Sequence, residues 1–430
     1  MAVNGSDTAW LLVSTALVLM MTPALGFFYG GMVRSKNALN TLMMSFSALG
    51  FVGLAWAVAG YSVAFGHASA WCGGGDYLLL RHVGLKASGT IPHVLFFAYQ
   101  GTFAIITAAL ISGAIVERMR FGPYIAFITI WSLVVYAPIA HWVWGGGWLS
   151  KLGALDFAGG TVVHINAAAA ALVCSIVVGS RKDYARQAIL PQNVPFTLLG
   201  AGLLWLGWFG FNAGSALAAN QTAALAFVNT MLAPAATLVV WTLLDLTRNA
   251  KATAIGAATG IVVGLVAVTP AAGFISPRGA IVLGIVAAFP SYFALLYRAT
   301  TRLDDSLDVV AAHGVGGIVG ALMTGVLALK RWNPAGADGA IAGNWSQLGI
   351  QAAAIAATIV YSAAATFVIL KVIALVTSLR TTTREEGLGL DFSQHGEEAY
   401  SQGEGALLLL ERRADVSSVA ATTPTSQADA

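Results

Sequence analysis

The chain has 430 residues, of which 57% are hydrophobic and only 10% are charged, and its formal net charge is +3. Because a soluble domain averages about 25% charged residues, this composition and a mean hydropathy of +0.77 exclude an ordinary soluble protein and predict a multi-pass membrane protein. The 2 cysteines are far apart in sequence and predict neither a disulfide framework nor a metal cluster, and no basic run interleaved with aromatic residues indicates nucleic-acid binding.

Eleven apolar segments are long enough to cross a lipid bilayer, which takes about 20 residues at about 1.5 Å each. In chain order they are residues 9–31, 39–65, 93–116, 122–143, 161–179, 195–215, 220–247, 253–271, 279–297, 308–329 and 348–379. The first segment lacks a basic flank and is too long for a secretory signal peptide, so we expect it to remain in the mature protein. The expected fold is all-α, with eleven transmembrane helices in residues 1–379 and a cytoplasmic tail in residues 380–430, of which 403–430 are largely disordered.

The connections between these segments carry positive charge unevenly. Those on one side of the membrane hold thirteen Lys and Arg residues, and those on the other side hold six. Because Lys and Arg accumulate on the cytoplasmic side, the richer side is predicted to face the cytoplasm. An odd number of spans then places the N-terminus outside and the C-terminus inside. Glu117 and Asp245 lie near cytoplasmic helix ends, where we expect them to be paired or to reach toward water.

The fifth and tenth segments each contain one histidine followed by small residues. His164 precedes "NAAAAA" and His313 precedes "GVGGIVG", and small residues let helices approach closely in lipid. Eleven segments divide as five, five and one, and two five-helix halves must run in opposite directions, which is the inverted repeat of many transporters. We therefore expect the two histidines to face each other near the middle of the membrane, with a long last helix outside the repeat.

Each histidine has a simpler explanation, in which the imidazole only hydrogen-bonds to a neighbouring helix and contributes about 0.6 kcal/mol. Two histidines at matching places, with no carboxylate within a turn of either, favour a functional pair. Desolvation disfavours the charged imidazole, so both should be largely neutral. Two neutral imidazoles can hydrogen-bond to each other and direct their outer nitrogens along a pore, which suits a small solute that exchanges protons.

Several long motifs, in order along the chain, resemble those of one transporter family. They are "FFYGGMVRSKN" (27–37), "YQGTFAIITAALISGAIVERMRF" (99–121), "HWVWGGGWL" (141–149), "DFAGGTVVHINAAAAALV" (156–173), "GWFGFNAGSA" (207–216) and "DDSLDVVAAHGVGGIVG" (304–320). The chain thereby resembles the ammonium transporters of the Amt/Mep/Rh superfamily, and its tail segment "GLGLDFSQHGEEAY" is similar to the bacterial Amt branch. The resemblance implies a protein of the cell (plasma or inner) membrane that moves ammonium or ammonia, with methylammonium as an analogue. The residues indicate no enzyme, no cofactor and no metal.

The resemblance implies an outer recruitment site for ammonium at Trp144, Phe103 and Ser215. An aromatic face attracts a cation by about 0.5–2 kcal/mol, and a hydroxyl can accept an N–H that potassium lacks. Trp144 is also explained as an interfacial tryptophan. Phe103 and Phe211 match the stacked rings that close the pore, and Phe211 and Ser215, four residues apart, share one helix face. Simple packing between helices is the alternative for these rings.

Below this gate, the resemblance assigns His164 and His313 to the pore as the twin histidines and Trp208 to the pore lining. It also matches Asp156 to an acid near the outer mouth. Asp156 lies eight residues before His164, roughly 12 Å along a helix, so we expect it to cap the fifth segment and to add a negative field rather than to touch the imidazole. Asp308, five residues before His313, is expected to be structural.

The resulting hypothesis is recruitment of ammonium, deprotonation, passage of ammonia past the imidazoles, and reprotonation inside, because desolvation below the rings favours the neutral form. The tail is similar to a cytoplasmic segment that lies along the inner face of a homotrimer in this family, and it implies docking of the P-II protein GlnK. His395 in the tail has no evident functional neighbours. Two alternatives stay open: an ammonium sensor that signals through its tail, and an ion-coupled carrier, which would usually place paired charges in mid-membrane.

Overall fold

A computed structural model describes residues 2–400 of the chain. Within that part all eleven predicted segments are helical, and ten of them form helices long and apolar enough to cross a membrane. The eighth segment is the shorter apolar helix α11 (Ala254–Val268), whose 15 residues extend about 22 Å. The expected all-α membrane fold is therefore confirmed, and the predicted disordered region 403–430 lies outside the described residues.

Each predicted segment corresponds to one helix or to a run of joined helices. The first seven are α1 (Gly5–Met32); α2 (Ala38–Ala55) with η2 (Trp56–Gly60) and α3 (Tyr61–Phe65); α4 (His93–Ile111); α5 (Phe121–Trp131) with η5 (Ser132–Tyr136) and α6 (Ala137–Val143); η6 (Gly160–Ile165) with α8 (Asn166–Val178); α9 (Val194–Gly214); and α10 (Gln221–Asn249). The last four are α11; α12 (Pro277–Ala299); η7 (Val310–Val315) with α13 (Gly316–Leu327); and α14 (Ser346–Val376). The short elements are η1 (Ser35–Asn37), η3 (Leu78–Leu80), the antiparallel strands β1 (Ala87–Ser88) and β2 (Ile91–Pro92), η4 (Ser112–Ala114), α7 (Trp148–Leu152), η8 (Ala340–Ala342), α15 (Thr383–Leu388) and η9 (Asp391–His395).

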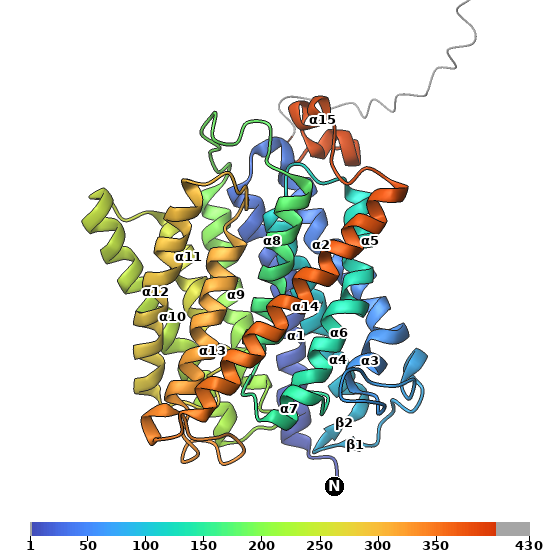
Figure 1. The fold of residues 1–430 in the computed structure, drawn as a ribbon, viewed down its shortest axis with the longest axis vertical. Helices are drawn as coiled ribbons and strands as arrows, with labels where there is room; N and C mark the ends of the chain where they lie inside the picture. Colours follow the sequence, from blue (N-terminus) through green and yellow to red (C-terminus); the bar gives the residue numbers. More distant parts are fainter. Residues whose placement is uncertain (1, 401–430) are drawn as a thin grey trace, which may run out of the picture.

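The helix bundle has two ends, which we call the N-terminal face and the tail face. The N-terminus, α7 and the two strands lie at the N-terminal face, and α15 lies at the opposite, tail face (Figure 1). The 31-residue helix α14 runs obliquely across the other helices (Figure 1). It is the long helix that the sequence places outside the five-plus-five repeat.

The first helices of the two halves, α1 and α9, pack closely because α9 carries a stripe of glycines. A β-carbon at Gly207, Gly210 or Gly214 would collide with atoms of α1. The two segments that carry the histidines also approach closely, since a β-carbon at Gly317 would lie 3.0 Å from Ile165. Small residues allow such close approach where lipid offers no hydrophobic drive for association. Both glycine contacts join one half of the fold to the other.

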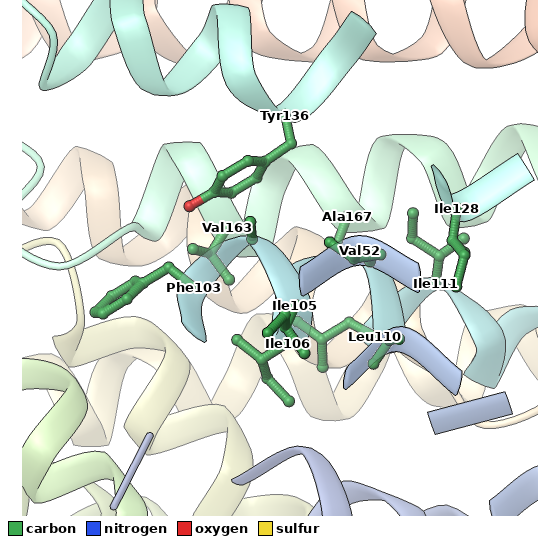
Figure 2. Packing of buried hydrophobic residues seen from close by; sticks show 14 of the residues in the cluster. Val52, Phe103, Ile105, Ile106, Leu110, Ile111, Ile128, Tyr136, Val163 and Ala167 are labelled. Atoms are coloured by element: carbon green, nitrogen blue, oxygen red, sulfur yellow. The ribbon is translucent and has the colours of Figure 1, made fainter. Parts of the chain in front are cut away.

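Helix α4 lies inside the first half and is held by apolar side chains from several helices (Figure 2). The buried cluster around it contains Ile105, Ile106, Leu110 and Ile111 from α4, Val52 from α2, Ile128 from α5 and Ala167 from α8. Close packing of such side chains leaves little freedom to rotate. Phe103 belongs to the same cluster (Figure 2), so its ring is fixed by the position of α4.

The tail folds back onto the tail face. The Asp391 carboxylate accepts hydrogen bonds from backbone N–H groups at the start of α2, including that of Asn40 at 2.7 Å, where a negative charge is favoured. The Lys36 ammonium donates to the Gly387 carbonyl at 2.6 Å. His395 Nε2 lies 3.0 Å from Asn40 Nδ2. His395, for which the sequence indicates no functional neighbours, thus lies in a docked tail and contacts the start of α2.

A buried ion network joins the tail face beneath the docked tail. Glu117 is fully buried and accepts hydrogen bonds from Arg34 and Arg181 at 2.9 Å each and from Asn37 at 3.0 Å. Arg181 also forms a two-pronged pair with Asp304. Burial raises the pKa of Glu117, but the two guanidinium groups outweigh it, so the pKa lies below its usual value. Glu117 is paired, as expected, and it ties together the connections that follow α1, α4 and α8.

We expect Glu117→Gln to lower the free energy of unfolding by about 3–5 kcal/mol, because it removes the buried carboxylate on which the Arg34 and Arg181 guanidinium groups converge. The measurement is the thermal unfolding midpoint of the purified protein in detergent. Asp183→Asn is the matched control: it removes the other carboxylate that pairs with Arg34, at a site where both side chains are about one-fifth exposed, and should cost at most about 1 kcal/mol. Equal midpoints for the two variants would contradict a structural role of the network.

Candidate functional site

A cavity of about 290 Å³ opens at the N-terminal face, and three of the predicted site residues line it. Phe103 comes from α4, Trp144 follows α6, and Ser215 follows α9. The remaining lining residues are Phe65, Phe96, Gln100, Val143, Phe157 and Leu217. We call this cavity the outer vestibule. Seven of its nine lining residues are aromatic or aliphatic, and Gln100 and Ser215 supply polar side chains, which is typical of a site for a small ligand.

The floor of the outer vestibule is a pair of phenyl rings. Phe103 and Phe211 stack with centroids 4.2 Å apart and an interplanar angle of 26°, and both side chains are buried. The Trp144 ring stands edge-on to Phe103 at 5.9 Å, and its Nε1–H donates to the Asp156 carbonyl at 2.9 Å. Ser215 Oγ donates to the Phe211 carbonyl at 2.8 Å and lies 3.3 Å from Tyr99 Oη, so at least one of its two lone pairs is left to accept a hydrogen bond.

The two predicted histidines meet beneath the phenyl pair. His164 Nδ1 and His313 Nδ1 are 3.2 Å apart, and their ring centroids are 5.2 Å apart. Each histidine lies in a π-helical segment, η6 or η7, and such segments occur often at functional sites. The Trp208 ring stacks on His164 at 5.4 Å, and its Nε1–H donates to Thr269 Oγ1 at 2.9 Å. Both imidazoles are almost completely buried, and the apolar surroundings disfavour their charged forms.

Two further cavities continue from the phenyl pair toward the tail face. A narrow cavity is lined by Phe211, Trp208 and both histidines, with apolar side chains around them. His313 also lines a larger cavity of about 550 Å³ at the tail face, together with Phe28. We call this larger cavity the inner vestibule. From the N-terminal face to the tail face, the three cavities therefore follow one another as the outer vestibule, the narrow cavity with the imidazole pair, and the inner vestibule.

Asp156 lies at the start of the fifth span and holds four backbone N–H groups. Oδ1 accepts from Gly159 and Gly160 at 2.9 and 2.6 Å, and Oδ2 accepts from Thr161 and Val162 at 2.8 and 3.1 Å. Gly159 has φ +115°, a conformation that L side chains rarely adopt, and it turns the chain so that the four groups converge. Burial raises the pKa of Asp156, while these N–H donors act in the opposite direction. The structure places Asp156 as a cap of the segment that carries His164, and it also orients Trp144 through its carbonyl.

Asp305 is the counterpart of Asp156 in the second half, and sequence reasoning missed it. It lies eight residues before His313, as Asp156 lies eight residues before His164, and its Oδ2 accepts from Val310 N at 2.7 Å at the start of η7. The repeated spacing of acid and histidine was the signal that could have found it. Asp308, expected to be structural, forms an ion pair with Arg298 at 2.6 Å.

Asp245, expected to be paired or to reach toward water, lines the inner vestibule. Within residues 2–400 no Lys or Arg pairs with its carboxylate, which instead accepts from Thr253 Oγ1 at 2.7 Å and from Tyr292 Oη at 3.1 Å. In the same described part of the chain, no three His, Cys, Asp or Glu side chains are arranged to hold a metal ion. The site thus consists of aromatic rings, neutral acceptors and two imidazoles.

Comparison with known proteins shows what this chain is similar to. Residues 9–400 match the model of the Ammonium Transporter Family. The chain is 47% identical over 398 residues to the ammonium transporter of Bacillus subtilis, covering 92% of this chain and 98% of that protein, and 49% identical over 403 residues to that of Aquifex aeolicus, covering 93% and 94%. The crystal structure of Saccharomyces cerevisiae Mep2 superposes with a TM-score of 0.86 at 34% identity, covering 94% of this chain and 93% of that chain.

Proposed function

Because this chain belongs to the ammonium transporter family, we propose that it recruits ammonium in the outer vestibule, deprotonates it, and conducts ammonia past the twin histidines toward the tail face. A current that accompanies uptake would show that the proton also crosses the membrane by a separate route. The observation that carries the proposal is the order of the site residues from the N-terminal face to the tail face. The stacked phenyl pair lies directly before the imidazole pair, with the Phe211 and His164 ring centroids 6.0 Å apart.

Recruitment rests on the aromatic faces and the hydroxyl of the outer vestibule. Ammonium and potassium are similar in size, so a size filter would separate them poorly. The Trp144 and Phe103 rings attract a cation, and a free lone pair of Ser215 Oγ can accept an N–H. Potassium has no N–H to donate. The vestibule therefore offers ammonium an interaction that potassium cannot make.

Deprotonation follows from the dryness of the passage below the rings. The stacked pair excludes hydrated ions and leaves an apolar constriction, so the positive charge of ammonium is destabilised there and loss of a proton is favoured. The two imidazoles touch through their Nδ1 atoms, so one Nδ1 donates and the other accepts. In neutral rings, the Nε2 of the donating imidazole then has a lone pair that can accept a proton, and the Nε2–H of the accepting imidazole can donate to ammonia. Trp208 stacks on His164 and supports its orientation.

The proposal also includes the orientation of the protein in the membrane and its partners. We propose that the tail face is cytoplasmic and the N-terminal face is outside, as the distribution of Lys and Arg indicates. We also propose a homotrimer in the cell membrane, with the docked tail contributing to a surface for the P-II protein GlnK. The docking of the tail through Asp391 and Lys36 supports an ordered inner face of the kind that such a partner requires.

The proposal is tested by reconstituting the full chain in liposomes and recording currents on a solid-supported membrane beside uptake of labelled methylammonium. We expect saturable uptake of methylammonium, a transient current on addition of ammonium when the proton also crosses, and no response to potassium at the same concentration. Electroneutral uptake without current would indicate net transport of ammonia alone. A potassium response equal to the ammonium response, or no uptake of methylammonium, would overturn the proposed function.

A further inference from the structure

One polar side chain in the outer vestibule has no role in the proposal so far. Gln100 lies on α4, and Phe96, Gln100 and Phe103 follow one another at spacings of four and three residues. Residues at these spacings share one helix face, and all three line the outer vestibule. Gln100 thus lies in the same wall as the Phe103 ring, next to the position where ammonium is recruited.

The Gln100 amide is buried without a hydrogen-bond partner for its oxygen. The residue is 9% exposed, and Oε1 is fully buried and unpartnered among the described residues. Its neighbours in the wall are apolar: Phe65, Phe96 and Phe103. A buried acceptor with no partner destabilises the folded protein, and native structures contain few of them. Because Oε1 has no exposed surface, a half-turn of the terminal amide has to bring it into the vestibule, where a ligand that donates a hydrogen bond would remove this cost.

We infer that Gln100 Oε1 is a second hydrogen-bond acceptor for ammonium in the outer vestibule and determines its selectivity together with Ser215. This inference rests on the proposed function. Ammonium carries four N–H groups, and within the described residues the side chains that line the vestibule offer only two neutral oxygen acceptors, Ser215 Oγ and Gln100 Oε1. The Trp144 Nε1–H cannot serve, because it is a donor and is already bound to the Asp156 carbonyl.

The chemistry of an amide suits this position better than a carboxylate would. An amide oxygen accepts an N–H but has no formal charge, so it favours a cation that carries N–H groups without attracting every cation equally. A buried carboxylate would bind potassium as well and would hold ammonium too strongly to release its proton below. Methylammonium has one methyl group in place of an N–H, so fewer of its orientations in the vestibule direct N–H groups at both acceptors.

The test compares Gln100→Leu and Gln100→Met, which keep the size of the side chain and remove the amide, with the wild-type chain in the same liposome assay. We expect the half-saturating ammonium concentration to rise about tenfold, as loss of a hydrogen bond to a charged group implies. The corresponding value for methylammonium should rise less, so the preference for ammonium over methylammonium falls. Gln100→Glu restores an acceptor and should recover ammonium affinity while making potassium an inhibitor.

Thr102→Val is the matched control on the same helix. Thr102 Oγ1 bonds the Tyr99 carbonyl at 2.6 Å and does not line the vestibule, so this variant should keep the wild-type half-saturation and the wild-type preference. Wild-type values in a folded Gln100→Leu or Gln100→Met protein would overturn the inference and leave the proposed function intact. An equal loss in Thr102→Val would also overturn it, because it would indicate distortion of α4. Absence of any ammonium response in the wild-type chain would overturn the proposed function itself.

Discussion

Uptake of labelled methylammonium is expected to fall about 100-fold when either His164 or His313 is replaced by alanine, the range seen when a group that exchanges protons is removed. The two imidazoles contact each other through Nδ1 at 3.2 Å, so loss of one leaves the other without its partner. The remaining ring would then lose the hydrogen bond that determines which of its two nitrogens carries the proton. Each single variant should therefore lose nearly as much transport as the double variant.

The control for this experiment is His67→Ala. His67 lies in a loop between α3 and α4, with its side chain 85% exposed, and its loss should leave uptake unchanged. Size-exclusion profiles and thermal midpoints of all variants separate loss of transport from loss of fold. Unchanged uptake together with unchanged selectivity against potassium in the folded His164→Ala and His313→Ala variants would remove the imidazoles from the mechanism.

Asp156→Ala is expected to lower both thermal stability and transport strongly. The carboxylate holds four buried N–H groups, and each buried donor left without a partner costs about 1–3 kcal/mol, so the total loss should be on the order of 5 kcal/mol. The η6 segment would lose its cap, and His164 would lose its defined position. Both the thermal unfolding midpoint and methylammonium uptake should fall.

Asp156→Asn separates the cap from the charge of Asp156. The amide keeps one acceptor oxygen, so the stability of the Asp156→Asn protein should lie between that of the wild-type chain and that of Asp156→Ala. The negative charge of the side chain is fully lost in this variant. If the negative field of Asp156 also attracts cations, uptake by Asp156→Asn should fall nearly as far as uptake by Asp156→Ala, although its thermal midpoint falls less. Asp76→Ala, at an acid whose side chain is 44% exposed, is the control at the same face. A wild-type thermal midpoint for Asp156→Ala would contradict the role as a cap.

The sequence predicted the span positions well, because crossing a membrane is a property of each segment alone. Twenty apolar residues in a row must form a helix in lipid, since no water is present to satisfy their backbone groups. The 15-residue helix α11 differs most from its predicted segment, residues 253–271, because the helix ends at Val268 and turns follow. The expected meeting of His164 and His313 followed from matching positions in two halves of opposite direction, which is also information that the sequence contains.

Other features could not be read from single segments. Asp305 repeats the eight-residue spacing of Asp156 and His164, yet its Oδ1 has no hydrogen-bond partner among the described residues, whereas each carboxylate oxygen of Asp156 accepts two N–H groups. The sequence therefore shows the similarity but not the difference. Asp245 carries a charge near a helix end, but whether a cation or a hydroxyl neighbour satisfies it depends on the packing of α10 against α11 and α12. The docking of His395 against α2 is likewise a contact between the two ends of the chain.

The sequence by itself thus determined the all-α membrane fold, the eleven helical segments and the identity of the two central histidines, because hydrophobicity and spacing act within one segment or between matching segments. Only the tertiary structure decided that the Phe103 and Phe211 rings stack at 4.2 Å, that Glu117 lies at the centre of a buried ion network, and that Gln100 Oε1 has no partner. The physical reason is that each of these features depends on the rotation of one helix about its axis relative to another. Close packing between helices, at glycines such as Gly207 and Gly317, fixes that rotation.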